Sequence, residues 1–211
     1  MFIIGLTGGI AAGKSSVAGH WVSLGAVEID ADQLAREAVA PGSEGLKQVV
    51  AHFGVEVLAG DQLDRQKLAQ IVFSNPQKRL DLEEIVHPIV RSLAKNRLSL
   101  LSKDAIVVYN IPLLVESQSH IPFDVVVTVE TPEHEQIRRM VELRNQSVEQ
   151  AKSRIRAQSS PTSRAAHADY ILNSNQSLDL LLKDAGALWF KFETLANKKQ
   201  REHSSNAEGS I

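Results

Sequence analysis

Residues 8–15 read GGIAAGKS, and this stretch decides the fold. It fits the pattern G-x-x-x-x-G-K-[ST] at every fixed position, which are Gly8, Gly13, Lys14 and Ser15. A short apolar run rich in β-forming residues leads into the stretch, and a helical pattern follows it. Strand, glycine-rich loop and helix form the context in which this pattern binds phosphate.

The spacing of the motif has a physical reason. The loop must curl so that backbone N–H groups point at phosphate oxygens, which needs glycine where the backbone comes closest or takes a positive φ. The following helix adds the partial positive charge of its N-terminus. We expect Lys14 to reach the β- and γ-phosphates of ATP and the Ser15 hydroxyl to ligate Mg²⁺. The predicted ATP-binding residues of this loop are Gly8, Gly9, Ala11, Ala12, Gly13, Lys14, Ser15 and Ser16.

Five short apolar runs predict the strands of one sheet. Their near-continuous apolar character, which in Ala105–Asn110 and Asp124–Val129 suggests burial on both faces, and the helical stretches between them argue for a parallel sheet covered on both sides. The predicted fold class is therefore α/β. The predicted strands are Phe2–Leu6, Ala26–Asp30, Ala105–Asn110, Asp124–Val129 and Tyr170–Leu172.

Two helical excursions leave the predicted sheet. About 70 residues separate the second and third strands, far more than one crossover helix needs, so residues 31–102 are predicted to form an inserted lobe. After the fourth strand, Thr131 and Pro132 suit the N-cap and first position of a helix over 133–145. A capping box at Ser147 predicts a second helix over 148–158.

The second excursion is strongly basic. Between Gln136 and Arg164, seven basic residues stand against two acidic ones, a local charge of +5 in a chain of net charge −2. A polyanion could bind there, although a solvated helical face is the simpler interpretation of this segment alone. The basic residues are Arg138, Arg139, Arg144, Lys152, Arg154, Arg156 and Arg164.

The composition of the 211 residues excludes several classes of function. The absence of cysteine removes disulfides, thiolate zinc sites and cysteine nucleophiles, and no H-E-x-x-H motif supports a histidine-bound metal. No signal-peptide pattern opens the chain and no apolar run approaches the ~20 residues that span a bilayer, so we expect a cytoplasmic protein without a membrane partner. The net charge of −2 and 5% aromatic residues argue against a nucleic-acid partner.

One domain is expected over residues 1–198. The last segment, residues 199–211, is small and polar and is predicted to be a disordered tail. The sequence does not indicate an oligomeric state.

Two carboxylates lie at the carboxyl end of the second predicted strand, which we expect beside the strand that leads into residues 8–15, the P-loop. A carboxylate there can accept the proton of an attacking hydroxyl, a contribution of about 10²–10⁴-fold. One of the pair, Asp30 and Asp32, can instead orient waters on Mg²⁺, and a helix N-cap is the common structural role of such a residue. Asp32 is the preferred base.

Further short pieces of sequence accompany the glycine-rich loop and the two aspartates. The pieces are Leu6–Ile10 leading into Gly13–Ser15, Ile29–Asp32 with Arg36, Leu63–Arg65, His87-Pro88, Pro112–Glu116, Arg139, Arg154 with Gln158, and Ala168–Tyr170. Most of these pieces are weak alone, but their order and spacing together are specific. Through them the chain resembles the dephospho-CoA kinase family from about residue 3 to residue 180.

The resemblance implies a P-loop kinase-like three-layer sandwich with a five-stranded parallel sheet. Its core would comprise residues 1–30, 103–131 and 165–198, its acceptor lobe residues 31–102, and its helical lid residues 132–164. ATP with Mg²⁺ would phosphorylate the ribose 3′-hydroxyl of dephospho-CoA, giving coenzyme A and ADP in the last step of coenzyme A biosynthesis.

The resemblance also implies roles for individual residues. Asp32 would be the base, Lys14 the γ-phosphate ligand and Arg139 the lid cation over the ATP phosphates. The substrate-binding residues would be Thr7, Asp32, Arg36, Arg65, His87, Leu113 and Glu116.

The chain departs from the family pattern in two places. A second lid arginine is expected one helical turn after Arg139, but that register falls on Leu143, with Arg144 one residue later. The family also tends to place an asparagine near adenine after the fifth strand. Three candidates stay open for that contact, namely Asn173, Ser174 and Asn175.

Other functions share a P-loop. A GTPase is disfavoured because no N/T-K-x-D motif follows a later strand. A kinase for nucleosides or nucleotides stays open, as does a non-catalytic nucleotide sensor or switch. ADP release over a panel of acceptors separates these alternatives.

Overall fold

The computed structural model describes residues 1–73, 75–117 and 121–208, without the side chains of 116–117 and 203–208. The chain divides into two compact units. The sheet unit comprises Met1–Ile29 and Ser102–Ile211, and the helical unit comprises Asp30–Leu101. The sequence places its inserted lobe over residues 31–102.

The main sheet has five strands in the order β2-β5-β1-β6-β7. Strand β1 pairs in parallel with β5 on one side and with β6 on the other, and β6 pairs in parallel with β7. The predicted α/β class and parallel sheet are confirmed. The strands are β1 (Phe2–Gly8), β2 (Val27–Asp30), β5 (Ile106–Asn110), β6 (Val125–Glu130) and β7 (Tyr170–Asn173).

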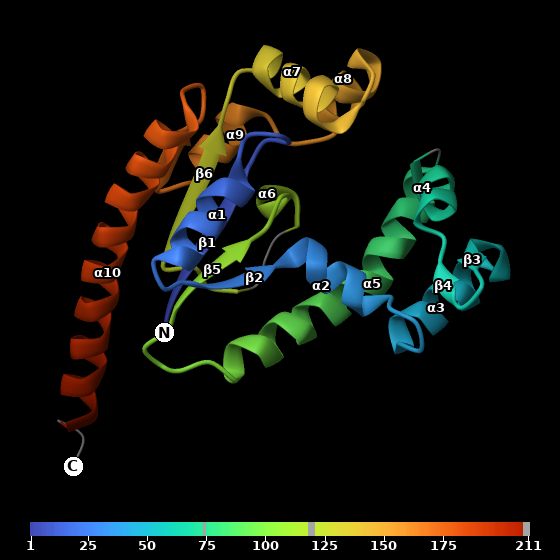
Figure 1. The fold of residues 1–211 in the computed structure, drawn as a ribbon. Helices are drawn as coiled ribbons and strands as arrows, with labels where there is room; N and C mark the ends of the chain where they lie inside the picture. The colour runs from blue at the N-terminus through green and yellow to red at the C-terminus, as the bar shows by residue number, and fades with distance from the viewer. Residues whose placement is uncertain (74, 118–120, 209–211) are drawn as a thin grey trace. The chain divides into compact units, whose positions relative to one another are not determined.

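Helices cover both faces of this sheet (Figure 1). Ile4 and Leu6 pack into the cluster that contains α1 and α10 side chains, while a Cβ on Gly5 would lie 3.0 Å from the Phe123 ring and 3.2 Å from Leu114 on α6. Because successive strand residues point to opposite faces, α6 covers the face opposite α1 and α10. The helices of this unit are α1 (Lys14–Ser23), α6 (Leu114–Ser117), α7 (Glu133–Arg144), α8 (Val148–Arg156), α9 (Pro161–Ala166) and α10 (Leu178–Glu208).

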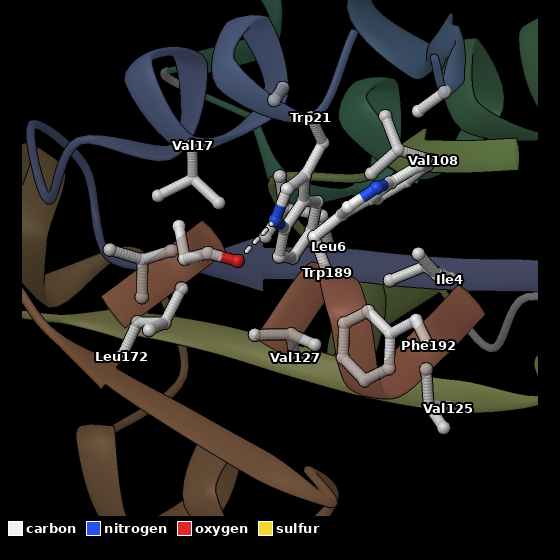
Figure 2. Close-up of a cluster of buried hydrophobic side chains, with 14 of the residues drawn as sticks. Ile4, Leu6, Val17, Trp21, Val108, Val125, Val127, Leu172, Trp189 and Phe192 are labelled. Carbon is white, nitrogen blue, oxygen red and sulfur yellow. Dashed lines mark hydrogen bonds between the residues drawn. The ribbon is translucent and has the colours of Figure 1, made fainter. Parts of the chain in front are cut away.

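The core of the sheet unit is a cluster of large apolar side chains between the sheet, α1 and α10 (Figure 2). The Phe192 ring packs edge-on to Trp21 and Tyr170, at centroid distances of 5.7 and 5.4 Å. The indole N–H of Trp21 donates to the Ala185 carbonyl on α10 at 2.8 Å, so the polar atom of this buried ring is satisfied. This packing fixes α1, and with it the loop that precedes α1.

The expected disordered tail is wrong for residues 199–208, because α10 continues to Glu208. No glycine or proline interrupts the sequence between Gly186 and Gly209, and Lys199 Nζ lies 2.6 Å from Asp124 Oδ1. Asp124 also accepts the Ile3 N–H through Oδ2 at 2.8 Å, so the carboxylate joins α10 to β1. Residues 209–211 of the predicted tail lie outside the described residues.

The two helices predicted after the fourth strand are confirmed as α7 and α8, and they pack against each other. The capping box is present, with Ser147 and Gln150 exchanging hydrogen bonds. The predicted N-cap at Thr131 is wrong by one residue, because the Pro132 carbonyl accepts the first helical N–H groups. The Thr131 hydroxyl is instead buried.

The helical unit contains four α-helices, a 3-10 turn and a two-stranded hairpin among its described residues. Arg97 on α5 forms two hydrogen bonds to the Glu37 carboxylate on α2, at 2.6 and 2.7 Å. The small hairpin was not predicted, since its strands have only two residues each. The elements are α2 (Ala31–Ala38), α3 (Glu44–Phe53), η1 (Val55–Val57), β3 (Leu58–Ala59), β4 (Gln62–Leu63), α4 (Arg65–Phe73) and α5 (Pro76–Ser99).

Over the described ranges, none of the helices has both the length and the apolar character that a bilayer crossing requires.

Phe192 and Phe190 provide a matched pair for testing the core, because they lie two residues apart on α10. Phe192 is fully buried, whereas Phe190 is 65% exposed. We expect Phe192→Ala to lower the free energy of unfolding by about 3–5 kcal/mol and Phe190→Ala to change it by less than about 0.5 kcal/mol. Urea unfolding measures both, and equal losses would contradict the packing described.

Candidate active site

The P-loop lies between β1 and α1, where the sequence predicts it. Gly13 is the N-cap of α1 and has a φ of 100°, and Ala11 also has a positive φ, of 57°. The Ala12 N–H donates to the Gly9 carbonyl at 3.1 Å, and the Ala12 methyl group is fully buried in the core. The hydrophobic core therefore anchors the middle of the loop.

The carbonyl oxygens of the loop are all held by side chains. Each of the five consecutive carbonyls of residues 8–12 accepts a hydrogen bond from a side chain of the sheet unit. A loop whose carbonyls are engaged in this way can turn N–H groups other than those of Ile10 and Ala12, which already donate to Gln158 and to the Gly9 carbonyl, toward an anion. The donors are Lys14 Nζ to Gly8 (2.7 Å) and Gly9 (3.1 Å), Gln136 Nε2 to Ile10 (2.8 Å), Arg139 Nη1 to Ala11 (3.1 Å) and the Ser174 hydroxyl to Ala12 (2.5 Å).

At two positions of the loop, neighbouring segments come so close that only glycine fits. A Cβ on Gly8, whose φ is 144°, would lie 2.2 Å from the Val129 carbonyl of β6. A Cβ on Gly9 would lie 2.3 Å from Gln136 Nε2. Side chains at either position would push β6 or α7 away from the loop.

Arg139 connects α7 with both the P-loop and the segment after β7. Besides its bond to the Ala11 carbonyl, its guanidinium donates to the Ser174 hydroxyl at 3.2 Å and to the Ser174 carbonyl at 2.7 Å. Its Nε lies 2.9 Å from Glu135, whose pKa is lowered to about 2 by hydrogen bonds from Arg138 and Arg139. The positive charge of Arg139 is thus held at the rim of the P-loop.

The three candidates for the adenine contact differ in exposure. Ser174 is 1% exposed, and its hydroxyl is engaged with the P-loop. Asn173 and Asn175 are exposed, and the Asn173 side chain accepts the Asn175 N–H at 2.9 Å.

The local charge of +5 overstates the free positive charge of the basic segment. Arg164 is buried and makes two 2.6 Å hydrogen bonds to the Glu130 carboxylate. Arg138 pairs with Glu135 and Glu142. The count missed Glu130 and Glu135 because they precede residue 136. Arg139 also pairs with Glu135. The other four basic residues, Arg144, Lys152, Arg154 and Arg156, are exposed.

Asn110 is a polar residue of the site that sequence reasoning missed. It ends β5, directly beside Leu6 of β1, and is 5% exposed. Its Nδ2 donates to Glu28 at 3.2 Å, but its buried Oδ1 has no hydrogen-bond partner within the described residues. The signal was present in the sequence, because a polar residue at the carboxyl end of a central parallel strand lies where ligands bind.

The sequence analysis also did not predict roles for Gln136 and Glu130, or the hydrogen bond from Ser174 to the P-loop. Gln136 lies four residues before the buried Met140, so it shares the inward face of α7. That spacing could have identified Gln136 as a buried polar residue, although not its target.

In the sheet unit, two predicted substrate-binding residues differ in exposure. Thr7 is buried, and its hydroxyl lies 3.4 Å from the Pro112 carbonyl. Leu113 is 44% exposed just after β5, as a ligand-facing apolar residue would be. The side chain of Glu116 lies outside the described residues.

In the helical unit, Asp30 is the N-cap of α2 and accepts the N–H groups of Asp32 and Gln33 at 2.7 and 3.2 Å. Asp32 is exposed in the first turn of that helix. Arg65, the first residue of α4, donates to the Arg36 carbonyl at 3.4 Å, so these two predicted residues lie together.

His87, the remaining predicted substrate-binding residue of the helical unit, lies half-buried within α5, directly before Pro88.

The fold and the loop together define a P-loop protein of the nucleotide-dependent kinase type. A family model described as dephospho-CoA kinase matches residues 2–179. The chain therefore belongs to the dephospho-CoA kinase family, which confirms the resemblance found in its motifs.

Individual relatives agree with this assignment. The dephospho-CoA kinase of Streptomyces avermitilis is 43% identical over 190 residues, which cover 90% of this chain and 93% of the relative. The crystal structure of TT1252 from Thermus thermophilus has a TM-score of 0.78 and 34% identity, over 90% of this chain and 97% of that one. A dephospho-CoA kinase from Campylobacter jejuni, 24% identical with a TM-score of 0.61 over 90% and 96% of the two chains, shares the fold.

Replacing alanine by glycine should affect the stability of the protein differently at positions 11 and 12. Ala11→Gly relieves a left-handed backbone that costs alanine about 1 kcal/mol, and the added flexibility of the unfolded chain offsets part of this gain. Ala12→Gly removes a buried methyl group from a residue with ordinary φ and should destabilise by about 1–2 kcal/mol. Urea unfolding should show Ala11→Gly at least as stable as the parent, and a loss as large as that of Ala12→Gly would refute the loop geometry.

Proposed function

We propose that the protein transfers the γ-phosphoryl group of ATP to the ribose 3′-hydroxyl of dephospho-CoA, giving coenzyme A and ADP in the last step of coenzyme A biosynthesis. The observation that carries this proposal is the family match over residues 2–179, which includes the P-loop and the whole helical unit. A cytoplasmic location stays a prediction from the sequence.

The P-loop is the proposed ATP site. With the carbonyls of residues 8–12 held by side chains, the loop N–H groups other than those of Ile10 and Ala12, together with N–H groups of the first turn of α1, would bind the phosphates. Lys14 now donates to the Gly8 and Gly9 carbonyls, and a γ-phosphate offers it a stronger, charge-assisted partner. Arg139, held beside Ala11, would neutralise charge that develops on the phosphates.

Mg²⁺ is the metal proposed to accompany ATP. It prefers oxygen ligands and keeps several of its waters. Two oxygens of the sheet unit suit it, the exposed hydroxyl of Ser15 and the buried Oδ1 of Asn110. Ser15 would ligate the ion and Asn110 would accept a hydrogen bond from one of its waters. When bound, the ion supplies charge neutralisation at the β- and γ-phosphates.

Asp32 is the proposed general base, and the helical unit is the proposed acceptor lobe. The Asp32 carboxylate would take the proton of the 3′-hydroxyl as that oxygen bonds to the γ-phosphorus, while the bond to the bridging oxygen breaks and ADP leaves. Asp30 is committed to capping α2, which supports Asp32 rather than Asp30 as the base. The other proposed acceptor residues are Thr7, Arg36, Arg65, His87, Leu113 and Glu116.

Residues 132–164 are proposed as a lid. Its helix α7 reaches the P-loop through Gln136 and Arg139, which supports a role in covering bound ATP. Closure would exclude water that otherwise competes with the sugar hydroxyl as phosphoryl acceptor.

The proposed function is tested by ADP release from the purified protein with ATP and Mg²⁺ over an acceptor panel. The panel holds dephospho-CoA, adenosine and AMP. We expect turnover with dephospho-CoA well above the other two. Higher turnover with adenosine or AMP would show that the acceptor is a nucleoside or nucleotide and not dephospho-CoA. Nucleotide binding without any acceptor-dependent ADP release would favour a sensor or switch.

The two aspartates allow a matched test of the base. Asp32→Asn should retain ATP binding and lose about 10²–10⁴-fold in turnover, because the proton acceptor is removed. Asp30→Asn should keep turnover within several-fold, because asparagine caps a helix as well as aspartate does. Turnover and ATP affinity are measured for both variants. Near-normal turnover of Asp32→Asn would assign the base elsewhere.

A further inference from the structure

Two glutamine side chains hold the two polar groups of a single P-loop residue. The Ile10 N–H donates to Gln158 Oε1 at 2.7 Å, and the Ile10 carbonyl accepts from Gln136 Nε2 at 2.8 Å. Gln136 lies on α7, and Gln158 follows the last residue of α8 by two positions. The two glutamines therefore reach the loop from α7 and from the turn after α8, and Figure 1 shows these two helices.

The orientation of each amide is fixed by its partner. A backbone carbonyl only accepts hydrogen bonds and a backbone N–H only donates them, so Gln136 must present its NH₂ group and Gln158 its oxygen. The two positions therefore differ in what a substitution can preserve. A carboxylate can replace the acceptor at position 158, but it cannot replace the donor at position 136.

The loop is shaped to receive the amide of Gln136. A Cβ on Gly9 would lie 2.3 Å from Gln136 Nε2 and 3.2 Å from Arg164 Nη2. Gly9 does not have a positive φ, so its backbone conformation alone would tolerate alanine. The approach of these side chains, rather than the backbone, explains the glycine.

Gln136 and Gln158 also line a cavity of about 410 Å³, together with Ile155, Pro161 and Ile171. Gln136 is nevertheless only 3% exposed, so the side chain that donates to the Ile10 carbonyl is buried.

We propose that Gln136 and Gln158 are positioning residues that clamp Ile10 and keep the P-loop in its phosphate-receiving shape while α7 and α8 lie against it. The proposal rests on the proposed function, in which ATP binds to this loop. Neither amide is assigned a contact with ATP. Affinity for ATP·Mg²⁺ should depend on a donor at 136 and an acceptor at 158, whereas affinity for dephospho-CoA should not.

The test places Leu and Glu at each position and measures the affinity of a fluorescent ATP analogue with Mg²⁺, without acceptor. Leu removes the hydrogen bond at both positions and should weaken binding about 10-fold or more. At 158, Gln158→Glu should bind better than Gln158→Leu, because the acceptor is kept. At 136, Gln136→Glu should bind worse than Gln136→Leu. Both Glu variants add one negative charge, so charge alone predicts the same order at both positions.

The controls separate positioning from general damage to the fold. Gln48→Leu and Gln48→Glu change an exposed glutamine on α3 and should leave binding and activity unchanged. Thermal melting checks that each variant folds. Where a variant does not fold, Gly9→Ala is measured in its place. Its methyl group would displace the Gln136 amide, so Gly9→Ala should weaken nucleotide binding when Gln136 is present and should add little when combined with Gln136→Ala.

The results distinguish the clamp from the proposed function. The clamp is supported if the Glu variant binds the ATP analogue more tightly than the Leu variant at position 158 and less tightly at position 136. The variants should also have a raised KM for ATP and an unchanged KM for dephospho-CoA. The same order at both positions, or unchanged affinity in both Leu variants, would overturn it. If the protein binds nucleotide in the predicted order but phosphorylates no acceptor, the proposed function fails and the clamp stands.

Discussion

The structure depends on how the carbonyl oxygens of one short loop are satisfied. A glycine-rich loop can bind an anion only if its N–H groups turn toward the ligand, and its carbonyls then need donors elsewhere. Here side chains supply them, from Lys14 at the end of the loop, from Gln136 and Arg139 on α7, and from Ser174 after β7. The P-loop is therefore completed by the helical pair and by the last strand of the sheet, and is not a self-contained motif.

A charged pair, Arg164 with Glu130, lies close to the P-loop and its partners. The buried Arg164 pairs with the partly buried Glu130, and one oxygen of Glu130 also accepts the Thr128 hydroxyl at 2.6 Å. A buried ion pair adds little net stability, but breaking it leaves an uncompensated charge, so it favours one arrangement of its helices. In the sequence the basic segment resembles a surface that could bind a polyanion. In the structure Arg139 of this segment holds the loop, and Arg164 pairs with Glu130.

The sequence predicts the framework well, because the framework follows from local patterns. Strand ends agree to within two residues, as in Phe2–Leu6 against Phe2–Gly8, since apolar runs end where the sheet does. The capping box at Ser147 is also local. The partners of the loop could not be predicted, because Gln136 and Ser174 are ordinary polar residues whose roles arise only when distant segments meet. The tail was mispredicted because a polar composition does not exclude a helix that gains an ion pair at Lys199.

The separation in sequence between the loop and its partners has a consequence for synthesis on the ribosome. The loop emerges among the first residues, but its contacts with Gln136, Arg139, Gln158 and Ser174 span 126, 128, 148 and 162 positions. Strand β1 also lacks both of its neighbours until residues 106–110 and 125–130 are made. A nascent chain thus carries the complete motif long before it can hold a nucleotide, and bound nucleotide can stabilise the protein only after nearly the whole chain has been translated.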